Sequence, residues 1–87
     1  MYAKRSSTRH HLGRVASMYV GDGYPARYCL VDDYSEGGVR VSLHGFTIPD
    51  EFVLRFSGKE RVTSGVYRVI WRQGHTAGAE LIAQRPS

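Results

Sequence analysis

The sequence predicts an all-β fold, a six-stranded antiparallel β-barrel with little or no helix. Three observations predict it: apolar and polar residues alternate over short segments, turn residues separate these segments regularly, and no segment has the periodicity of an amphipathic helix. With 87 residues, the chain is expected to form one domain with a single modest core. The connections between expected strands are too short for crossovers, so neighbouring strands are expected to be antiparallel.

The expected strands follow from the alternating residues, taken in chain order. They are Val15, Ser17 and Tyr19; Tyr28 and Leu30 against Cys29 and Val31; Val39, Val41 and Leu43 against Arg40 and Ser42; Phe52, Leu54 and Phe56 against Val53 and Arg55; and Tyr67, Val69 and Trp71 against Arg68, Ile70 and Arg72. A last strand is expected near residues 79–83. Glycine-containing turns at 21–25, 36–38, 57–59 and 73–75 separate most of these segments.

The ends of the chain are polar, which sets the expected domain limits. We expect a flexible basic segment at 1–11, the barrel at 12–83 and a frayed tail at 84–87. The net charge of +4 fits an anionic partner without choosing among DNA, RNA, lipid and nucleotide. No apolar run is long enough to cross a membrane and no secretory signal is evident. Cys29 is the single cysteine, which excludes an internal disulfide and favours a cytoplasmic location.

The histidines do not predict a metal site. His10 and His11 are adjacent in sequence, a spacing that rarely brings two ligands onto one ion. His44 and His75 are far from them, in unrelated turns, and no cysteine pair or carboxylate cluster completes a ligand set. We therefore expect no metal.

The sequence predicts no catalytic site either. Ser42 and His44 are two residues apart and could share a strand face, but no third group or oxyanion donor accompanies them. Asp32 and Asp33 are consecutive, so strand alternation predicts that they face opposite sides. Cys29 alternates with apolar neighbours and is expected to fill the core. We expect that the protein is not an enzyme.

Two motifs carry the functional argument. Arg5 and Arg9 form an RxxxR pattern, and guanidinium groups bind phosphates and guanine edges through paired N–H donors. Asp33, Ser35 and Gly38 form a DxSxxG pattern at a strand end. A structural role alone would also account for the second motif, with the two side chains capping a turn and the glycine supplying a positive φ angle or a bulge. The combination of both motifs in one small β domain favours binding of an anionic, guanine-containing ligand.

This combination resembles the PilZ domain, the bacterial receptor for cyclic di-GMP, here as a single-domain member. The resemblance extends over roughly residues 4–82 and implies a six-stranded antiparallel β-barrel. It implies that Arg5 and Arg9 wrap over the ligand, that Asp33 accepts from a guanine N–H or orients an arginine, and that Ser35 donates to the ligand. Gly38 would allow close approach of the backbone. Unlike many members, the chain has no helix after its last expected strand.

The resemblance also implies a signalling role. Lys4, His10 and Arg40 are further candidate contacts to cyclic di-GMP, and no other cofactor is expected. Ligand would order the segment at 1–11, which would then present a new face to an unidentified downstream effector protein. The protein is expected to be a monomer.

Two alternative functions remain open at the level of the sequence. A PilZ-like domain could act as a protein-interaction adaptor that binds no nucleotide. A small barrel could also bind nucleic acid, with aromatic side chains as stacking platforms. These side chains are Tyr19, Tyr24, Tyr28, Tyr34 and Trp71. Nucleic acid is disfavoured because most of these aromatics alternate into expected core faces, and because Asp32, Asp33 and Glu36 would repel a polyanion.

Overall fold

The computed structural model of the chain describes residues 10–21, 23–57 and 62–84 and confirms the all-β prediction. It contains six strands and no helix within these ranges, and so no helix there that could cross a membrane. The strands are β1 (His10–Tyr19), β2 (Arg27–Ser35), β3 (Gly38–Ser42), β4 (Glu51–Ser57), β5 (Val62–Gln73) and β6 (Thr76–Gln84).

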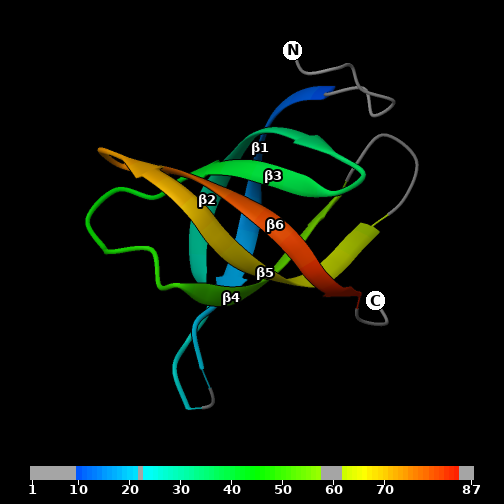
Figure 1. The fold of residues 1–87 in the computed structure, drawn as a ribbon. Coiled ribbons are helices and arrows are strands. Elements are labelled where there is room, and N and C mark those ends of the chain that lie inside the picture. Colours follow the sequence, from blue (N-terminus) through cyan, green and yellow to red (C-terminus); the bar gives the residue numbers. More distant parts are fainter. Residues whose placement is uncertain (1–9, 22, 58–61, 85–87) are drawn as a thin grey trace.

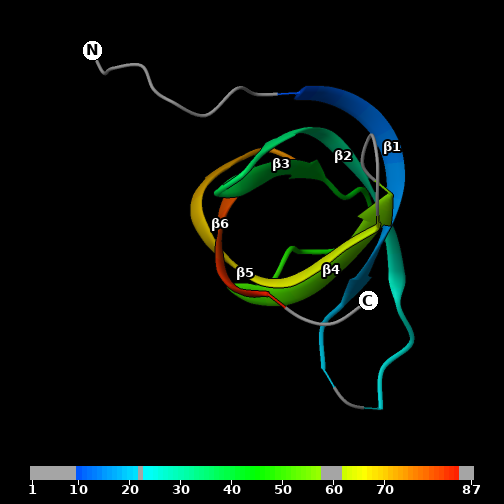
Figure 2. The same ribbon diagram turned by 90° about the vertical axis from the view of Figure 1, so that its right-hand side faces the viewer.

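The six strands form one closed barrel in the order β1-β2-β3-β6-β5-β4, and every neighbouring pair is antiparallel (Figure 1). Figure 2 looks along the barrel and shows the strands closing into a ring. The pairs β2–β3 and β5–β6 are joined by tight turns at 36–37 and 74–75. Such turns connect antiparallel strands directly, as the short connections in the sequence predict.

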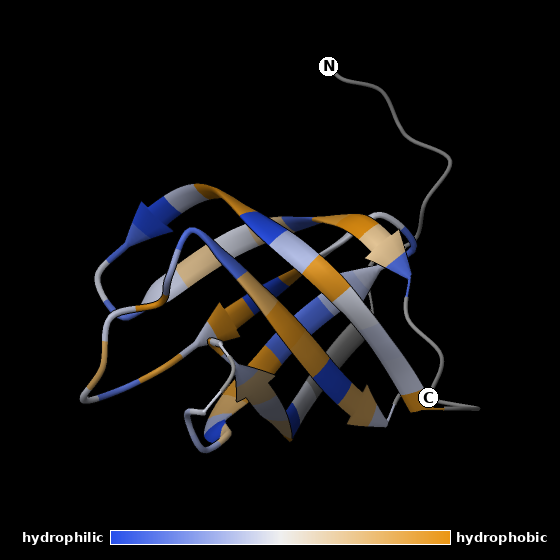
Figure 3. Ribbon diagram, turned by 90° about the horizontal axis from the view of Figure 1, so that it is seen from below, coloured by the Kyte–Doolittle hydropathy of each residue, from blue (hydrophilic) through white to orange (hydrophobic). Residues whose placement is uncertain are grey.

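The interior of the barrel is filled by one side of each strand. Hydrophobic and hydrophilic residues alternate along the ribbons in Figure 3. The predicted alternation of Phe52, Leu54 and Phe56 is confirmed, since all three are buried. Cys29 is 5% exposed and belongs to this core, as predicted. The largest side chains that are fully buried are Met18, Leu54, Val31, Val39 and Val41.

The predicted inward face of β1 is wrong. Val15 is 67% exposed, whereas Ala16 and Met18 are buried. Both faces of this strand carry apolar residues, so alternation alone cannot choose between them. Strand pairing decides which face of β1 is buried. Ala16 lies opposite the buried Cys29, and residues directly opposite each other share a face.

The alternation predicted for β5 fails near its end. Tyr67 is buried, but Ile70 and Trp71 are 61% and 42% exposed. The pairing between β5 and β6 shifts between Val69 and Trp71, which leaves Ile70 as an extra residue in β5. A β-bulge of this kind re-aims the side chains that follow it.

We predict that Leu54→Ala lowers the free energy of unfolding by about 2–5 kcal/mol, because it leaves a cavity in a close-packed core. Leu30→Ala is the matched control, since Leu30 is 39% exposed and Leu54 is 0% exposed. Urea denaturation of both variants and the parent protein measures the effect. Equal losses in the two variants would contradict the assignment of Leu54 to the core.

Burial raises the pKa of the Cys29 thiol to about 11, with a smaller contribution from the nearby Asp32 carboxylate. Since the ordinary value is 9.0, the unfolded chain loses this proton first as the pH rises. We therefore predict that the contribution of Cys29 to stability is complete below pH 9 and is lost between about pH 9 and 11. Denaturation of the parent protein and Cys29→Ala across this range should show a steeper fall for the parent. Parallel pH dependences would contradict it.

Candidate ligand-binding groove

A β-bulge in β2 places the DxSxxG motif on the outer surface. Val31 lies opposite Val41, and the next pair along the ladder is Asp33 with Arg40, so Asp32 is an extra residue in β2. Val31 and Val41 both point into the core. Beyond the bulge, Asp33 shares the face of Arg40, and it is the following residue, Tyr34, that packs against the core.

The same bulge corrects the prediction for Asp32 and Asp33. Asp32 accepts a hydrogen bond from the Ser42 hydroxyl at 2.7 Å, and Asp33 forms an ion pair with Arg40 at 2.8 Å. Ser42 and Arg40 are two residues apart on β3 and therefore lie on the same face. Both carboxylates thus meet partners on the outer face, rather than on opposite sides as strand alternation predicts. Each is held by a different donor.

The motif residues line one groove of about 550 Å³ on the outer wall of the barrel. Asp33, Ser35 and Gly38 all contribute to its lining, as does Arg40. The structure therefore brings together these four residues of the predicted site.

Two rows of directly paired residues cross the groove. The first row runs from Asp33 on β2 through Arg40 on β3 and Gly78 on β6 to Trp71 on β5. The second runs from Ser35 through Gly38 and Glu80 to Arg68 on the same strands. Each row has a glycine near its middle, Gly78 in the first and Gly38 in the second, at the floor of the groove. The polar motif lies on one side of this floor and the β5 side chains lie on the other.

Gly38 is required by the packing of β3 against β6. A Cβ atom at this position would lie 2.7 Å from the carbonyl oxygen of Ala79, closer than side chains tolerate. Gly38 is not among the described glycines with a positive φ angle. The motif glycine is thus explained by close approach of two backbones and not by a left-handed turn.

The far side of the groove was not part of the predicted site. Ile70 and Trp71 line it, and the Trp71 indole lies so close over Gly78 that no side chain fits there. The sequence signal was the Trp71–Gly78 pair across a tight hairpin. The bulge at Ile70 that turns Trp71 outward has no comparable sequence signal.

The described lining of the groove carries more negative than positive charge. Asp33 and Glu80 are acidic, and Arg40 is the one cation among the described lining residues. Arg68 lies opposite Glu80 but is paired with Glu51 at 3.2 Å. The Arg40 Nε atom is buried and has no hydrogen-bond partner among the described residues. An anion in this groove would therefore need additional cations.

The remaining predicted residues precede β1. Lys4, Arg5 and Arg9 lie outside the described residues. His10 is the first residue of β1, and its backbone lies opposite Tyr34, between Asp33 and Ser35 of the motif. The described chain therefore begins directly beside the groove.

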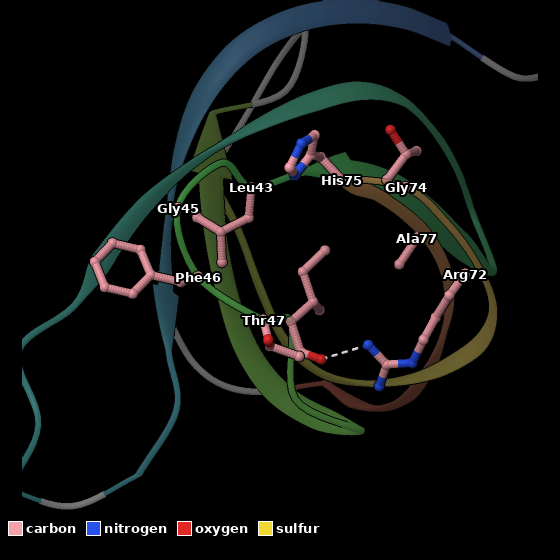
Figure 4. Close-up of a pocket in the computed structure, with 10 residues that line it drawn as sticks. Leu43, Gly45, Phe46, Thr47, Arg72, Gly74, His75 and Ala77 are labelled. Atoms are coloured by element: carbon pink, nitrogen blue, oxygen red, sulfur yellow. Dashed lines mark hydrogen bonds between the residues drawn. The ribbon is translucent and has the colours of Figure 1, made fainter.

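A second cavity, of about 400 Å³, lies at one end of the barrel (Figure 4). Figure 4 shows Arg72 reaching across this end, where its Nη1 atom donates to the carbonyl oxygen of Ile48 at 2.5 Å. Its other terminal nitrogen is paired with Asp50 at 2.6 Å. Phe46 points away from the barrel axis, and the Arg27 guanidinium carbon lies 3.7 Å from the centroid of its ring. None of the predicted site residues that the structure describes lines this cavity, and its Arg72 is already bonded to Ile48 and Asp50.

The barrel end also corrects two predictions about histidine. The turns that carry His44 and His75 are not unrelated, because the two ring centroids are 4.4 Å from each other. His44 lies in the bend after β3 and not on a strand with Ser42, whose hydroxyl is engaged by Asp32 and Thr76. In the ranges that the structure covers, no three His, Cys, Asp or Glu side chains gather as a metal site would require.

Comparison with known proteins adds no assignment. No model of a protein family matches the chain, and no curated protein is significantly similar to it.

We predict that Gly78→Ala displaces the Trp71 indole, because a Cβ atom at position 78 would overlap it. Trp71 is the single tryptophan, so its fluorescence reports on this change directly. The emission maximum should move to longer wavelength as the indole becomes more exposed. Gly37→Ala is the matched control, since no described atom lies within 4 Å of its added methyl group. Identical spectra for the two variants would contradict the described packing.

Proposed function

We propose that the protein is a receptor of the PilZ type that binds cyclic di-GMP in the groove between β2 and β5. One observation carries the proposal: the bulge at Asp32 gathers Asp33, Ser35, Gly38 and Arg40 around a single groove. Its volume of about 550 Å³ falls within the ~300–1,000 Å³ of typical small-molecule sites. Sites of this kind combine a few convergent polar groups with an apolar surface, and Trp71 and Ile70 supply the latter.

The chemistry of the groove matches guanine. Guanine presents N–H donors on one edge, and the Asp33 carboxylate is an acceptor at 4% exposure, where a charge-assisted hydrogen bond is strong. The exposed indole of Trp71 offers a flat surface for stacking of a purine. Gly38 and Gly78 lie in the middle of the two rows between the polar motif and Trp71. Ser35 supplies a hydroxyl donor on the same row as Gly38.

The two phosphate groups of the ligand require cations that the described lining lacks. We assign this role to Arg5 and Arg9. Arg9 directly precedes His10, so their Cα atoms are about 3.8 Å apart, and His10 lies opposite Tyr34 at the edge of the groove. Arg40 is a third candidate, because it lines the groove and its side chain is 43% exposed.

The proposed output is a change at the start of the chain. Ligand held between the groove and the arginines would order residues 1–11 over the β2–β3 surface, and the ordered segment would contact an effector protein. The support for this step is the polar, basic composition of the segment and its attachment to β1 beside the groove.

Nucleic-acid binding is the second candidate, and one observation strengthens it. The expectation that the aromatics lie mostly in the core is wrong, since Tyr19, Tyr24, Tyr28 and Trp71 are 41%, 64%, 75% and 42% exposed. Only Tyr34 among them packs against the core. Tyr28 and Trp71 lie on β2 and β5, however, which β3 and β6 separate. These two rings do not form one continuous platform for a strand of bases.

We predict that titration calorimetry detects saturable binding of cyclic di-GMP to the protein. Arg9→Ala should weaken it roughly tenfold to a hundredfold, the loss expected for a charged hydrogen-bonding partner. Ser35→Ala should weaken it about three- to tenfold, because a neutral hydrogen bond contributes less. The melting temperature of each variant should stay within a few degrees of the parent.

Two control ligands separate the candidates. GTP contains guanine and phosphate but not the cyclic dinucleotide, and it should not bind at the same concentration. A mixed-sequence oligodeoxynucleotide at 50 and 200 mM salt tests the second candidate, since its affinity would fall steeply with salt. A folded protein that binds the oligonucleotide but gives no heat with cyclic di-GMP would overturn the receptor assignment. A folded protein that gives no heat with either cyclic di-GMP or the oligonucleotide would leave the protein-interaction adaptor as the remaining function.

A further inference from the structure

Two neighbouring rows of paired residues spread apart as they pass from β3 through β2 to β1. Their members, in that order, are Val41, Val31 and Arg14 in one row and Arg40, Asp33 and His11 in the other. The two rows are one residue apart on β3, two residues apart on β2 and three residues apart on β1. Each strand from β3 toward β1 therefore holds one more residue between the same two rows.

The row that contains Asp33 is the one that crosses the groove to Trp71. It continues onto β1 at His11, and the next row sets His10 opposite Tyr34. β1 therefore begins alongside the polar side of the groove. The register of β1 against β2 fixes where along this side the preceding residues join the barrel.

The extra residue in β1 depends on Gly13. The pairing of β1 with β2 shifts between His11 and Arg14, and Gly13, within this shift, has a φ angle of +59°. A glycine in the left-handed conformation defines one class of β-bulge. Residues with a side chain rarely adopt this conformation, and for β-branched residues it is a clear outlier. The bulge in β1 is thus built on the conformational freedom of glycine at position 13.

We propose that Gly13 is a positioning residue for the ligand, which holds the arginine segment, residues 5–9, in register with the groove. The inference rests on the proposed function, in which Arg5 and Arg9 bind the phosphates. Gly13 itself has no side chain with which to contact the ligand. It acts through the bulge, which sets the position from which the arginine segment leaves the barrel.

Loss of the bulge would shift the first part of β1 by one residue. Strict pairing continued from Arg14 would set His10 opposite Ser35, whereas the bulge sets it opposite Tyr34. Such a slip moves a strand by about 3.4 Å and exchanges the two faces of its side chains. The arginine segment is joined to His10 and would be displaced from the groove by the same step.

The test compares two side chains of similar size at position 13 of the full chain. Valine disfavours the left-handed conformation strongly, whereas asparagine tolerates it. In titration calorimetry, Gly13→Val should weaken the binding of cyclic di-GMP at least about tenfold, and Gly13→Asn should stay within about threefold of the parent. Gly23→Val is the matched control and should also stay within about threefold. Gly23 has a φ angle of +84°, no described atom lies within 4 Å of its added Cβ atom, and its turn joins the other ends of β1 and β2.

Two further readouts separate positioning from a general loss of stability. In the Gly13→Val background, Arg9→Ala should cost less than about threefold, against the roughly tenfold to hundredfold expected in the parent, because the arginine is already displaced. Nuclear magnetic resonance should show that backbone contacts between His10 and Tyr34 are lost in Gly13→Val. Those between Val15 and Leu30, beyond the bulge, should persist.

The outcomes distinguish this inference from the function on which it rests. A parent protein that does not bind cyclic di-GMP would overturn the proposed function and this inference with it. If the parent binds, three results would overturn the inference alone and leave the receptor assignment intact. They are equal affinity of Gly13→Val and the parent, equal weakening by Gly13→Val and either Gly13→Asn or Gly23→Val, and a full loss from Arg9→Ala in the Gly13→Val background.

Discussion

The single extra residue in β2 is the constraint on which the outer surface depends. Before the bulge, Cys29 and Val31 fill the core, and after it Tyr34 does so. A strand without the bulge would keep strict alternation and direct Asp33 into the core beside Val31, where an unpaired carboxylate is costly. With the bulge, the carboxylate meets Arg40 on the outer face at 2.8 Å. The motif is thus compatible with a barrel only because the extra residue at Asp32 reverses which side chains of β2 face the core.

Three independent features of the β-sheet form the groove. The bulge in β2 supplies its polar side, a second bulge in β5 turns Trp71 outward over Gly78 as the opposite side, and close packing of β3 on β6 requires a glycine at position 38. Bulges are frequent beside binding sites because they re-aim side chains without breaking a sheet. The resulting surface has acceptors and a stacking platform but little positive charge. This imbalance is why the proposed function assigns the phosphates to Arg5 and Arg9.

The sequence was sufficient for the fold and for half of the groove. Alternation and turn spacing predict six antiparallel strands, and the phase of β4 is clear because Phe52, Leu54 and Phe56 oppose polar neighbours. Which face of β1 points into the core is not predictable from sequence, because both faces are apolar. Only the pairing of Ala16 with the buried Cys29 decides between them. Trp71 was missed as a wall of the groove, and Asp32 and Asp33 were predicted on opposite faces although they share one, for a single reason. An extra residue in one strand is a property of the pairing and not of the strand itself.

The most direct test of this account is nuclear magnetic resonance of the isotopically labelled protein during titration with cyclic di-GMP. Binding in the groove predicts saturable shifts at the amides of Ser35, Gly38 and Gly78 and at the indole N–H of Trp71, all of which belong to its two rows. Residues at the barrel end, such as Phe46 and His75, should not move. Shifts confined to the barrel end, or no shifts from a folded protein at millimolar ligand, would contradict the assignment of the groove.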